Sequence, residues 1–437
     1  MTKKKIVVLG AGFGGLAFTK ALKHPNAEVV LIDRQNHHLF QPLLYQVATA
    51  GLAMPDIAEP VRSIFRKRSD VTVLMEKVSG IDVRSKQVFL EQSSPIDYDY
   101  LIIGLGMVNA YFGHDEWACH SIGLKSLDEA RRVRRRVLHA FERAEATADA
   151  ESRNRLMTTV VIGGGPTGVE MAGAISELTK RVFKKDFRSI RPEESRVVLV
   201  EAADRLLGTY TNPSSEKALE GLRELGVEVI LKSPVQDVRD GEVELEDQTI
   251  QAESIIWTAG VQANPVLRDL PAEFDRQGRI SVEADTSLPG FPEVFVIGDV
   301  ANLTDAAGKQ VPGVSPAAMQ MGSYAAKIIT KELREKRAIP TDERKPFKYL
   351  DKGTMATIGR SKAVAEVAGL KFSGLFAWIL WLAVHLIFLV GFRNRAAVLL
   401  QWAYAYIGYK PGARVFDLPT SEQNESENYR KLESKNS

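Results

Sequence analysis

Short apolar runs that end in glycine open the chain and predict buried parallel strands. Residues 6–9 form the first run, and a glycine-rich turn follows it. Residues 16–22 then have helical character, and residues 29–32 form the next apolar run. Strand, turn, helix and strand within about 30 residues make a βαβ unit. We therefore expect a nucleotide-type module at the start of the chain.

A second unit of the same kind starts 153 residues later, counted from Gly10 to Gly163. Its strands are predicted at 158–162 and 197–200, with a helix at 169–180 between them. Further strands are predicted at 71–74, 100–103, 255–257 and 294–297, and an arginine-rich helix with a solvated face at 126–150. No low-complexity linker separates the modules, so one is expected to be inserted in the other. The predicted fold class is α/β, with two Rossmann-like dinucleotide-binding domains.

The chain changes character near residue 371. Residues 372–392 carry no charge, and a second apolar stretch with several aromatic residues covers 396–409. About 20 apolar residues suffice to span a bilayer, so a transmembrane helix is one interpretation. Five basic residues and no acidic residue lie between 371 and 414, and aromatic residues with cations favour an interfacial element on anionic lipid. A buried dimer interface is the third interpretation. Residues 416–437 are polar and predicted to be disordered.

Composition narrows the class of protein. The 437 residues suggest about three domains, and 45% hydrophobic with 26% charged residues exclude a disordered or collagen-like chain. The formal charge of +2 gives no reason to expect nucleic acid as a partner. The single cysteine, Cys119, excludes an intramolecular disulfide, a redox pair and a thiolate metal cluster, and no metal is expected. Residues 6–9 are too short for a signal peptide, which predicts folding in the cytoplasm.

The first glycine fingerprint comprises Gly10, Gly12, Gly14 and Gly15. The pattern glycines allow a tight turn, a close approach of a pyrophosphate to the backbone, and close packing of helix on strand. The pyrophosphate lies at the helix N-terminus, where free N–H groups favour anions. Asp33 follows about 20 residues later, at the end of the next strand, where a carboxylate binds ribose hydroxyls.

The second fingerprint contains Gly163, Gly165 and Gly168, and its acidic residue is Glu201. A carboxylate at this place accepts hydrogen bonds from a free 2′-hydroxyl and repels a 2′-phosphate, which predicts NADH as the ligand. Arg205 lies close in sequence and leaves NADPH open. Two fingerprints imply two dinucleotides, and without a cysteine pair the simplest arrangement is a flavin that takes a hydride from a nicotinamide.

A third motif indicates which module holds the flavin and which holds the nicotinamide dinucleotide. The stretch from Val294 to Val300 resembles the second flavin motif of two-dinucleotide flavoproteins, in which the aspartate, here Asp299, binds the ribityl chain. This resemblance implies that the first fingerprint holds non-covalent FAD and that the inserted module binds NADH.

Longer stretches resemble a narrower family, the type II NADH:quinone oxidoreductases, which are single-subunit NADH dehydrogenases that pump no protons. The similar stretches are 38–48, 165–170, 257–260 and 351–359, in consistent order within about 5–412. The resemblance implies a hydride transfer from NADH to FAD and two-electron reduction of a membrane quinone, either menaquinone or ubiquinone. It also implies a peripheral, monotopic enzyme on the cytoplasmic face of the cell membrane, in contact with the lipid surface and expected to form a homodimer.

The same resemblance assigns roles to individual residues. Glu170 matches a glutamate beside the nicotinamide that is linked to the quinone site, although a helix N-terminal acid favoured by the dipole is the alternative. Pro42, Leu43 and Tyr45 would lie near the flavin, or form a plain core turn. Gln320 would bind a quinone carbonyl. The remaining assignments are Ala318 beside the flavin and Gly260 in the NADH module.

Three departures from the family pattern stand out. Pro316 and Met321 occupy positions where many members carry glutamine, so Gln320 alone remains to bind a quinone carbonyl. At 104–106 this chain has Gly-Leu-Gly where relatives commonly have Ala-Thr-Gly, which removes a hydroxyl near the FAD. We expect altered packing there and the same class of reaction.

The predicted domain order follows from these assignments. It is an FAD-binding domain at 1–118 and 271–345, an NADH-binding domain at 119–270, a membrane-anchoring region at 346–415 and a polar tail at 416–437. Two alternatives stay open, a reductase of a soluble acceptor of the ferredoxin type and an NADH-sensing flavoprotein with a protein partner. A sulfide:quinone oxidoreductase would need at least two cysteines, and Cys119 stands alone.

Overall fold

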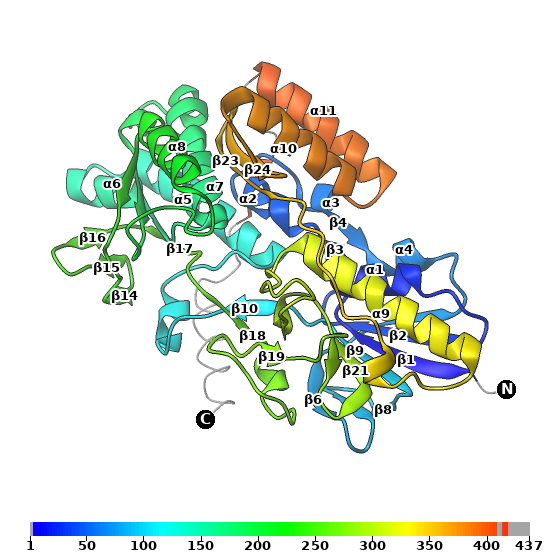
Figure 1. The fold of residues 1–437 in the computed structure, drawn as a ribbon. Coiled ribbons are helices and arrows are strands. Elements are labelled where there is room, and N and C mark those ends of the chain that lie inside the picture. Colours follow the sequence, from blue (N-terminus) through cyan, green and yellow to red (C-terminus); the bar gives the residue numbers. More distant parts are fainter. Residues whose placement is uncertain (1–2, 409–412, 418–437) are drawn as a thin grey trace. The chain divides into compact units, whose positions relative to one another are not determined.

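The computed structural model describes residues 3–408 and 413–417, and its contacts divide the chain into two compact units. The first unit contains the segments that end at Leu39, Val108 and Lys352, and the second contains the segments that start at Phe40, Asn109 and Gly353. Figure 1 shows the order of the elements along the chain.

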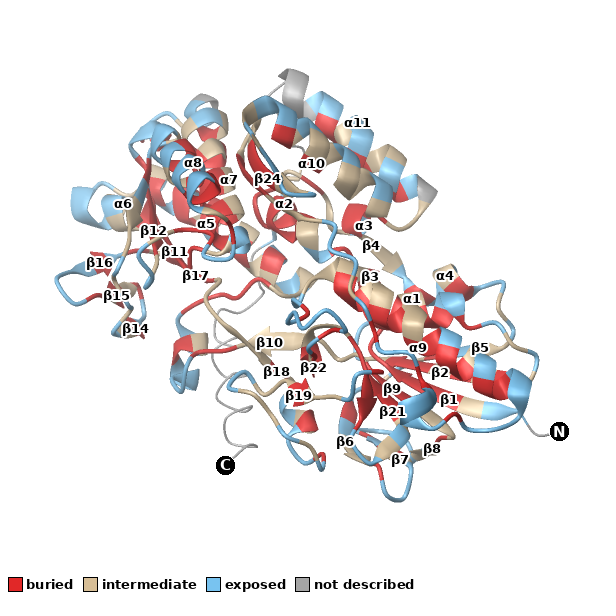
Figure 2. Ribbon diagram, viewed as in Figure 1, coloured by how far each residue is buried: buried red, intermediate tan, exposed pale blue. Residues whose placement is uncertain are grey.

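A six-stranded sheet forms the centre of the first unit, in the order β20-β21-β9-β1-β2-β5. All its neighbouring strands are parallel except β20 and β21. The strands are β1 (Lys4–Leu9), β2 (Ala27–Asp33), β5 (Val71–Met75), β9 (Tyr100–Ile103), β20 (Ser287–Leu288) and β21 (Phe291–Val296). These bounds match the predicted runs within a few residues, because a strand covered on both faces needs a continuous apolar sequence. Figure 2 shows β1, β9 and β21 largely in the buried class.

Two helices, α1 (Phe13–Ala21) and α9 (Ser315–Glu335), pack side by side on this sheet (Figure 1). A Cβ at Gly322 would lie 2.2 Å from the carbonyl oxygen of Gly14, so the two helices approach each other backbone to backbone. Smaller elements of this unit are β3 (His37–Leu39), β4 (Ala58–Pro60), α4 (Val61–Phe65), β6 (Val78–Asp82), β7 (Gln87–Leu90), β8 (Ile96–Asp97), β18 (Val261–Ala263), β19 (Ile280–Ser281) and β22 (Ala301–Asn302).

The second unit has a parallel four-stranded sheet in the order β13-β12-β11-β17. Its strands are β11 (Thr158–Ile162), β12 (Arg196–Val200), β13 (Val227–Ile230) and β17 (Ser254–Trp257), and its helices are α5 (Leu127–Ala146), α6 (Ala150–Leu156), α7 (Pro166–Glu177) and α8 (Asn212–Glu224). A hairpin sheet of β14 (Asp237–Arg239), β15 (Glu242–Glu244) and β16 (Thr249–Gln251) is attached. The two sheets confirm the predicted α/β class with two Rossmann-like modules.

The C-terminal part of the second unit is a β-sheet followed by two helices. The antiparallel strands are β23 (Thr354–Gly359), β24 (Lys362–Val367) and β25 (Leu370–Ser373), and the helices are α10 (Gly374–Phe388) and α11 (Phe392–Gly408). Helix α10 packs on β24 and against α11 (Figure 1). Two short helices, α2 (Leu44–Ala48) and α3 (Met54–Ile57), belong to the same unit, as α2 packs on α7 and α3 on α11.

The structure corrects two predicted helices. The charge-free stretch 372–392 is not one helix, because β25 takes its first two residues and Gly391, with φ +91°, ends the turn after α10. None of the helices in the described ranges is both long and apolar enough to cross a bilayer. The predicted helix 126–150 ends at Ala146, and α6 starts separately where Asp149 caps it by accepting a hydrogen bond from Ser152 N. Residues 409–412 and the polar tail from 418 lie outside the described part.

Candidate active site

The first fingerprint forms the turn between β1 and α1. Gly10 has φ +97°, and a Cβ there would lie 2.3 Å from the carbonyl oxygen of Gly104. A Cβ at Gly15 would lie 1.9 Å from the oxygen of Gly10, so turn and helix pack too closely for a side chain. A Cβ at Gly12, in contrast, would meet no protein atom within 4 Å. Gly12 therefore leaves space where a pyrophosphate approaches the N-terminus of α1.

Asp33 lies at the end of β2 and is fixed beside this turn. Its Oδ2 accepts a hydrogen bond from Ala11 N at 2.6 Å, and its Oδ1 accepts one from Gln35 N at 2.8 Å. Burial raises the pKa of this carboxyl group, and the two hydrogen bonds oppose the rise. The residue thus has the place and the acceptor atoms that a ribose-binding carboxylate needs.

His38 is a residue of this site that the sequence did not reveal. Its buried ring makes a T-shaped contact with Phe13, at 5.1 Å between ring centroids, and its Nδ1 donates to the carbonyl oxygen of Ala11 at 2.8 Å. Burial lowers its pKa to about 4, so the ring is neutral and Nε2 carries a lone pair. That Nε2 is a buried atom without a hydrogen-bond partner in the described part of the chain. A lone histidine in a short strand carries no sequence signal for this role.

Asp299, Gly14 and Ala318 come together at one end of the sheet. Asp299 is in a short 3-10 turn after β21, and the start of α9 lies beside it, since a Cβ at Gly298 would be 3.2 Å from the Cβ of Ala318. A Cβ at Gly14 would lie 3.3 Å from the carbonyl oxygen of Ala318. The first fingerprint, Asp33 and Asp299 thus belong to one unit, and the open Gly12 with the orphaned His38 nitrogen fits a large dinucleotide such as FAD.

Gln320, the predicted quinone ligand, forms two hydrogen bonds with the backbone of Leu350. Its Nε2 donates to Leu350 O at 3.0 Å and its Oε1 accepts from Leu350 N at 2.9 Å. The amide nitrogen has a second hydrogen, which is the one that a quinone carbonyl would use. Met321 is buried, so this departure from the family pattern fills core space.

The second fingerprint repeats the construction of the first in the other unit. Gly163 has φ +108°, and a Cβ at Gly168 would lie 1.8 Å from its carbonyl oxygen, while a Cβ at Gly165 would meet nothing within 4 Å. Gly260 also has a positive φ, +79°, and a Cβ there would lie 2.5 Å from the ring of Phe112. Gly165 is therefore the open position, and the other three glycines are required by close packing.

Glu201 ends β12 beside this turn. Its Oε2 accepts from Gly164 N at 2.5 Å and its Oε1 accepts from Ala203 N at 2.7 Å. Both bonds hold the carboxylate at the edge of the cradle, in the same relation to its turn as Asp33 has to the first. This is the arrangement for binding ribose hydroxyls.

Glu170 lies on α7, two residues beyond Gly168 of the second fingerprint. Its Oε1 accepts from Thr357 N of β23 at 3.3 Å, and burial of the carboxyl group raises its pKa to about 8. The indole N–H of Trp381, on α10, makes no hydrogen bond of good geometry with the described residues. It nevertheless lies close enough to the Glu170 carboxyl group to offset part of the rise in its pKa. Glu170 therefore holds its proton to a higher pH than an exposed glutamate does.

A buried hydrogen-bond chain connects Thr357 to helix α11. Trp402 Nε1 donates to Gln46 Oε1 at 2.8 Å, and Gln46 Nε2 donates to Tyr45 Oη at 3.0 Å. Tyr45 Oη and Thr357 Oγ1 share the next bond at 2.9 Å. Because Tyr45 accepts from Gln46, its own hydrogen is available to Thr357. Pro42 and Leu43 directly precede α2, which carries Tyr45 and Gln46, so their segment is held next to this chain.

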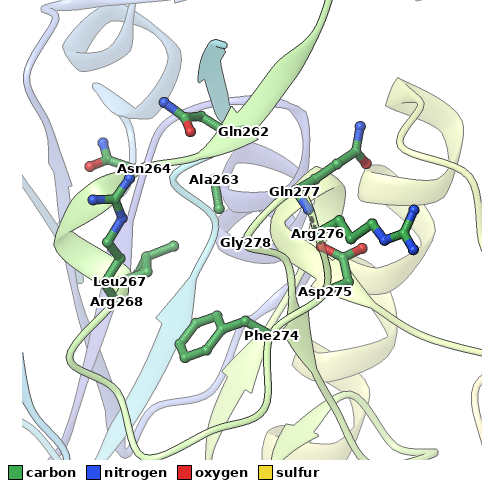
Figure 3. A pocket seen from close by; sticks show the side chains of 10 residues that line it. All are labelled: Gln262, Ala263, Asn264, Leu267, Arg268, Phe274, Asp275, Arg276, Gln277 and Gly278. Atoms are coloured by element: carbon green, nitrogen blue, oxygen red, sulfur yellow. Dashed lines mark hydrogen bonds between the residues drawn. The ribbon is translucent and has the colours of Figure 1, made fainter. Parts of the chain in front are cut away.

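The first unit has a surface pocket of about 330 Å³ (Figure 3). It is lined by Gln262, Ala263, Asn264, Leu267, Arg268, Phe274, Asp275, Arg276, Gln277 and Gly278. Asp275 is bound by Gln277 N at 2.9 Å and by the Arg279 guanidinium at 2.7 Å. None of the predicted site residues lines this pocket.

The fold and the two cradles define the class of protein. Residues 4–322 match the pyridine nucleotide-disulphide oxidoreductase family, and residues 352–408 match the NDH2 C-terminal domain. With 18% identity and a TM-score of 0.86, the structure resembles that of NDH2 from Plasmodium falciparum in complex with NADH, covering 95% of this chain and all of that one.

Sequence relatives narrow the class to one family. The chain is 41% identical over 422 residues to the type II NADH:quinone oxidoreductase Ndh of Mycobacterium tuberculosis, which covers 94% of this chain and 89% of that protein. It is 40% identical to NdhA of the same organism, over 94% and 88% of the two chains. The chain belongs to the type II NADH:quinone oxidoreductases, as the resemblance of its motifs implied.

Proposed function

We propose that the protein is an FAD-dependent NADH:quinone oxidoreductase that passes two electrons from NADH to a membrane quinone without pumping protons. The observation that carries this proposal is the pair of dinucleotide cradles, each with one glycine left open and one anchored carboxylate, Asp33 and Glu201. FAD, when bound, supplies hydride acceptance from nicotinamide and electron donation to quinone. Every other part of the reaction depends on how the chain binds, orients and protonates.

The two cradles divide the binding work. Gly12, Asp33 and Asp299 would hold the flavin dinucleotide, and Gly165 with Glu201 would hold NADH. In both cradles the pyrophosphate would lie at a helix N-terminus, that of α1 or α7, where backbone N–H groups stabilise negative charge. Both cradles therefore bind through backbone groups that are in place before the ligand arrives.

Glu170 has the properties of a proton donor for quinone reduction. Forming a quinol from a quinone takes up two protons, and a carboxyl group with a pKa of about 8 carries one at neutral pH. Thr357 N holds the carboxyl group from β23. We propose that Glu170 supplies or relays one of these protons.

The outer surface of α10 and α11 supports attachment to a membrane. Large apolar side chains are exposed here, namely Leu375, Phe376, Ile379, Ile387, Leu399, Leu400 and Tyr404. Arg393 and Arg395, in the first turn of α11, are exposed too, and cations beside an apolar surface favour anionic lipid. A peripheral, monotopic position on the cytoplasmic face would give a lipid-dissolved menaquinone or ubiquinone access to the enzyme. A homodimer would cover part of the same surface.

Turnover with different acceptors tests the proposal. The FAD-loaded protein is bound to liposomes that contain menaquinone or ubiquinone, and NADH oxidation is followed at 340 nm. We expect rapid turnover with at least one quinone. Turnover with a ferredoxin-type acceptor and none with either quinone would show that the protein is a soluble-acceptor reductase instead.

A further inference from the structure

Arg205 is the cation closest in sequence to Glu201, and its position bears on which dinucleotide the second cradle accepts. The loop after β12 folds back over the fingerprint. Ala203 N donates to Glu201 Oε1 at 2.7 Å, and Leu207 N donates to Gly164 O at 2.8 Å. Arg205 lies between these two anchor points, so its side chain starts at the rim of the adenosine ribose site.

The guanidinium of Arg205 is nevertheless bound elsewhere. Its Nη1 donates to Asn212 Oδ1, and its Nη2 donates to Gly208 O at 2.7 Å. Both acceptors are neutral, so Arg205 is held by hydrogen bonds and its positive charge is not cancelled by a carboxylate in these contacts. Such a charge remains available to an anion if the hydrogen bonds break.

Asn212 is a fixed acceptor because the start of α8 is anchored. Glu366, on β24, accepts from Thr211 N at 2.9 Å, from Thr211 Oγ1 at 2.7 Å and from Ser214 Oγ at 2.6 Å with the same oxygen. Asn212 is the first residue of α8 and lies between these two residues. The C-terminal sheet thus fixes the residue that holds Arg205.

We propose that Asn212 is a specificity-determining residue for NADH over NADPH, because it withholds Arg205 from the adenosine 2′ position. With Arg205 bound to Asn212, a 2′-phosphate would meet the Glu201 carboxylate with no arginine to offset the repulsion. Arginine pairs with phosphate in a bidentate geometry, so a released Arg205 would favour the phosphorylated dinucleotide. Two residues then disfavour NADPH together: the Glu201 carboxylate repels the 2′-phosphate, and Arg205, bound to Asn212, does not pair with it.

Lys232 is the competing cation at this rim. It follows β13, its backbone N donates to Ala203 O at 2.9 Å, and its ammonium group makes no hydrogen bond or ion pair with the described residues. An untethered lysine could serve a 2′-phosphate whatever Asn212 does. The experiment therefore has to separate Arg205 from Lys232.

The test compares Glu201→Gln with Glu201→Gln/Asn212→Ala, both loaded with FAD. The kcat/KM ratio for NADPH over NADH is measured with a soluble quinone, and the Kd of 2′,5′-ADP is measured by calorimetry. We expect the added Asn212→Ala to raise the ratio and tighten 2′,5′-ADP binding about tenfold, the value of one charge-assisted hydrogen bond. Adding Arg205→Met to the Glu201→Gln/Asn212→Ala variant should abolish this gain. Adding Lys232→Met to the same variant should leave the gain unchanged.

Two outcomes would overturn the proposal. The first is that adding Asn212→Ala to Glu201→Gln gives no gain in the NADPH/NADH ratio or in 2′,5′-ADP binding, or gives a gain that persists with Arg205→Met or is lost with Lys232→Met. The other concerns Glu201→Gln/Arg205→Met, which keeps Asn212 in place and needs no change at α8. We expect this variant to bind 2′,5′-ADP as Glu201→Gln does, and weaker binding would show that Arg205 already reaches the phosphate. Asn212→Asp keeps the acceptor atom and should give no gain in either quantity.

Discussion

Replacing Glu170 with glutamine should remove one pH dependence from quinone reduction. The side chain keeps its size and its acceptor for Thr357 N, but it has no proton to give. Burial raises the pKa of Glu170 from 4.5 to about 8, so about 90% of the carboxyl groups are protonated at pH 7 and about 10% at pH 9. If Glu170 donates a proton in the step that limits flavin reoxidation, that step slows about ninefold between these two pH values.

The same titration affects stability, with a definite sign. Between pH 4.5 and about 8 the folded protein holds a proton on Glu170 that the unfolded chain has released. The free energy of unfolding is therefore highest, as far as Glu170 is concerned, at low pH. It declines by about 1.4 kcal/mol per pH unit as the pH rises from 4.5 toward 8. Glu170→Gln lacks this decline, so the stability gap between the two proteins should shift in favour of the variant from pH 6 to pH 8.

Stopped-flow kinetics measures the rate directly. The FAD-loaded protein is reduced with NADH without oxygen and mixed with a soluble quinone at pH values from 6 to 9.5. We expect the wild-type rate to fall with an apparent pKa near 8 and the Glu170→Gln rate to be lower at pH 7 and flat across this range. Equal pH profiles for the two proteins would refute the assignment of Glu170 as proton donor.

Three further predictions rest on single contacts. Gly12→Ala should fold but lose FAD affinity, whereas Gly15→Ala should fail to fold stably because its Cβ would lie 1.9 Å from a carbonyl oxygen; flavin content and melting temperature separate the two. Trp402→Phe should lower stability by about 1–3 kcal/mol, since Gln46 Oε1 loses its buried donor, as urea unfolding at fixed pH would show. Leu400→Asp, at a side chain 69% exposed on α11, should weaken liposome binding without changing flavin reduction by NADH. Phe89→Asp, at a side chain 37% exposed on β7 of the first unit, should leave liposome binding unchanged. Equal liposome binding by all three proteins would contradict a lipid contact at α11.

Local glycine geometry explains why the sequence predicted the cradles so closely. Gly10, Gly15, Gly163 and Gly168 are each forced by a backbone atom within a short stretch of chain or at the neighbouring strand. The constraints on Gly15 and Gly168 come from Gly10 and Gly163 of the same βαβ unit, so the spacing of the glycines alone reveals them. Those on Gly10 and Gly163 come from Gly104 and Ala259, which lie much later in the chain. The strands were predictable for a related reason, because a fully buried parallel strand needs an uninterrupted apolar run.

Contacts between distant segments were not predictable in this way. Trp402 and Gln46 are 356 residues apart, and nothing in either stretch marks the other as its partner. The sequence placed Arg205 near Glu201, but it could not show that Asn212 would hold the side chain. The apolar stretch 372–392 left a spanning helix and an interfacial element open, because hydropathy does not detect that the chain turns at Gly391, between α10 and α11.

The central claim is that electrons pass from NADH through bound FAD to a membrane quinone, and one anaerobic experiment tests it most directly. The FAD-loaded protein on quinone-free liposomes is given one equivalent of NADH, and the flavin absorbance near 450 nm is followed. Menaquinone or ubiquinone in liposomes is then added. The account predicts fast bleaching on the first addition and fast return of the absorbance on the second. A flavin that bleaches and is reoxidised by neither quinone would contradict it.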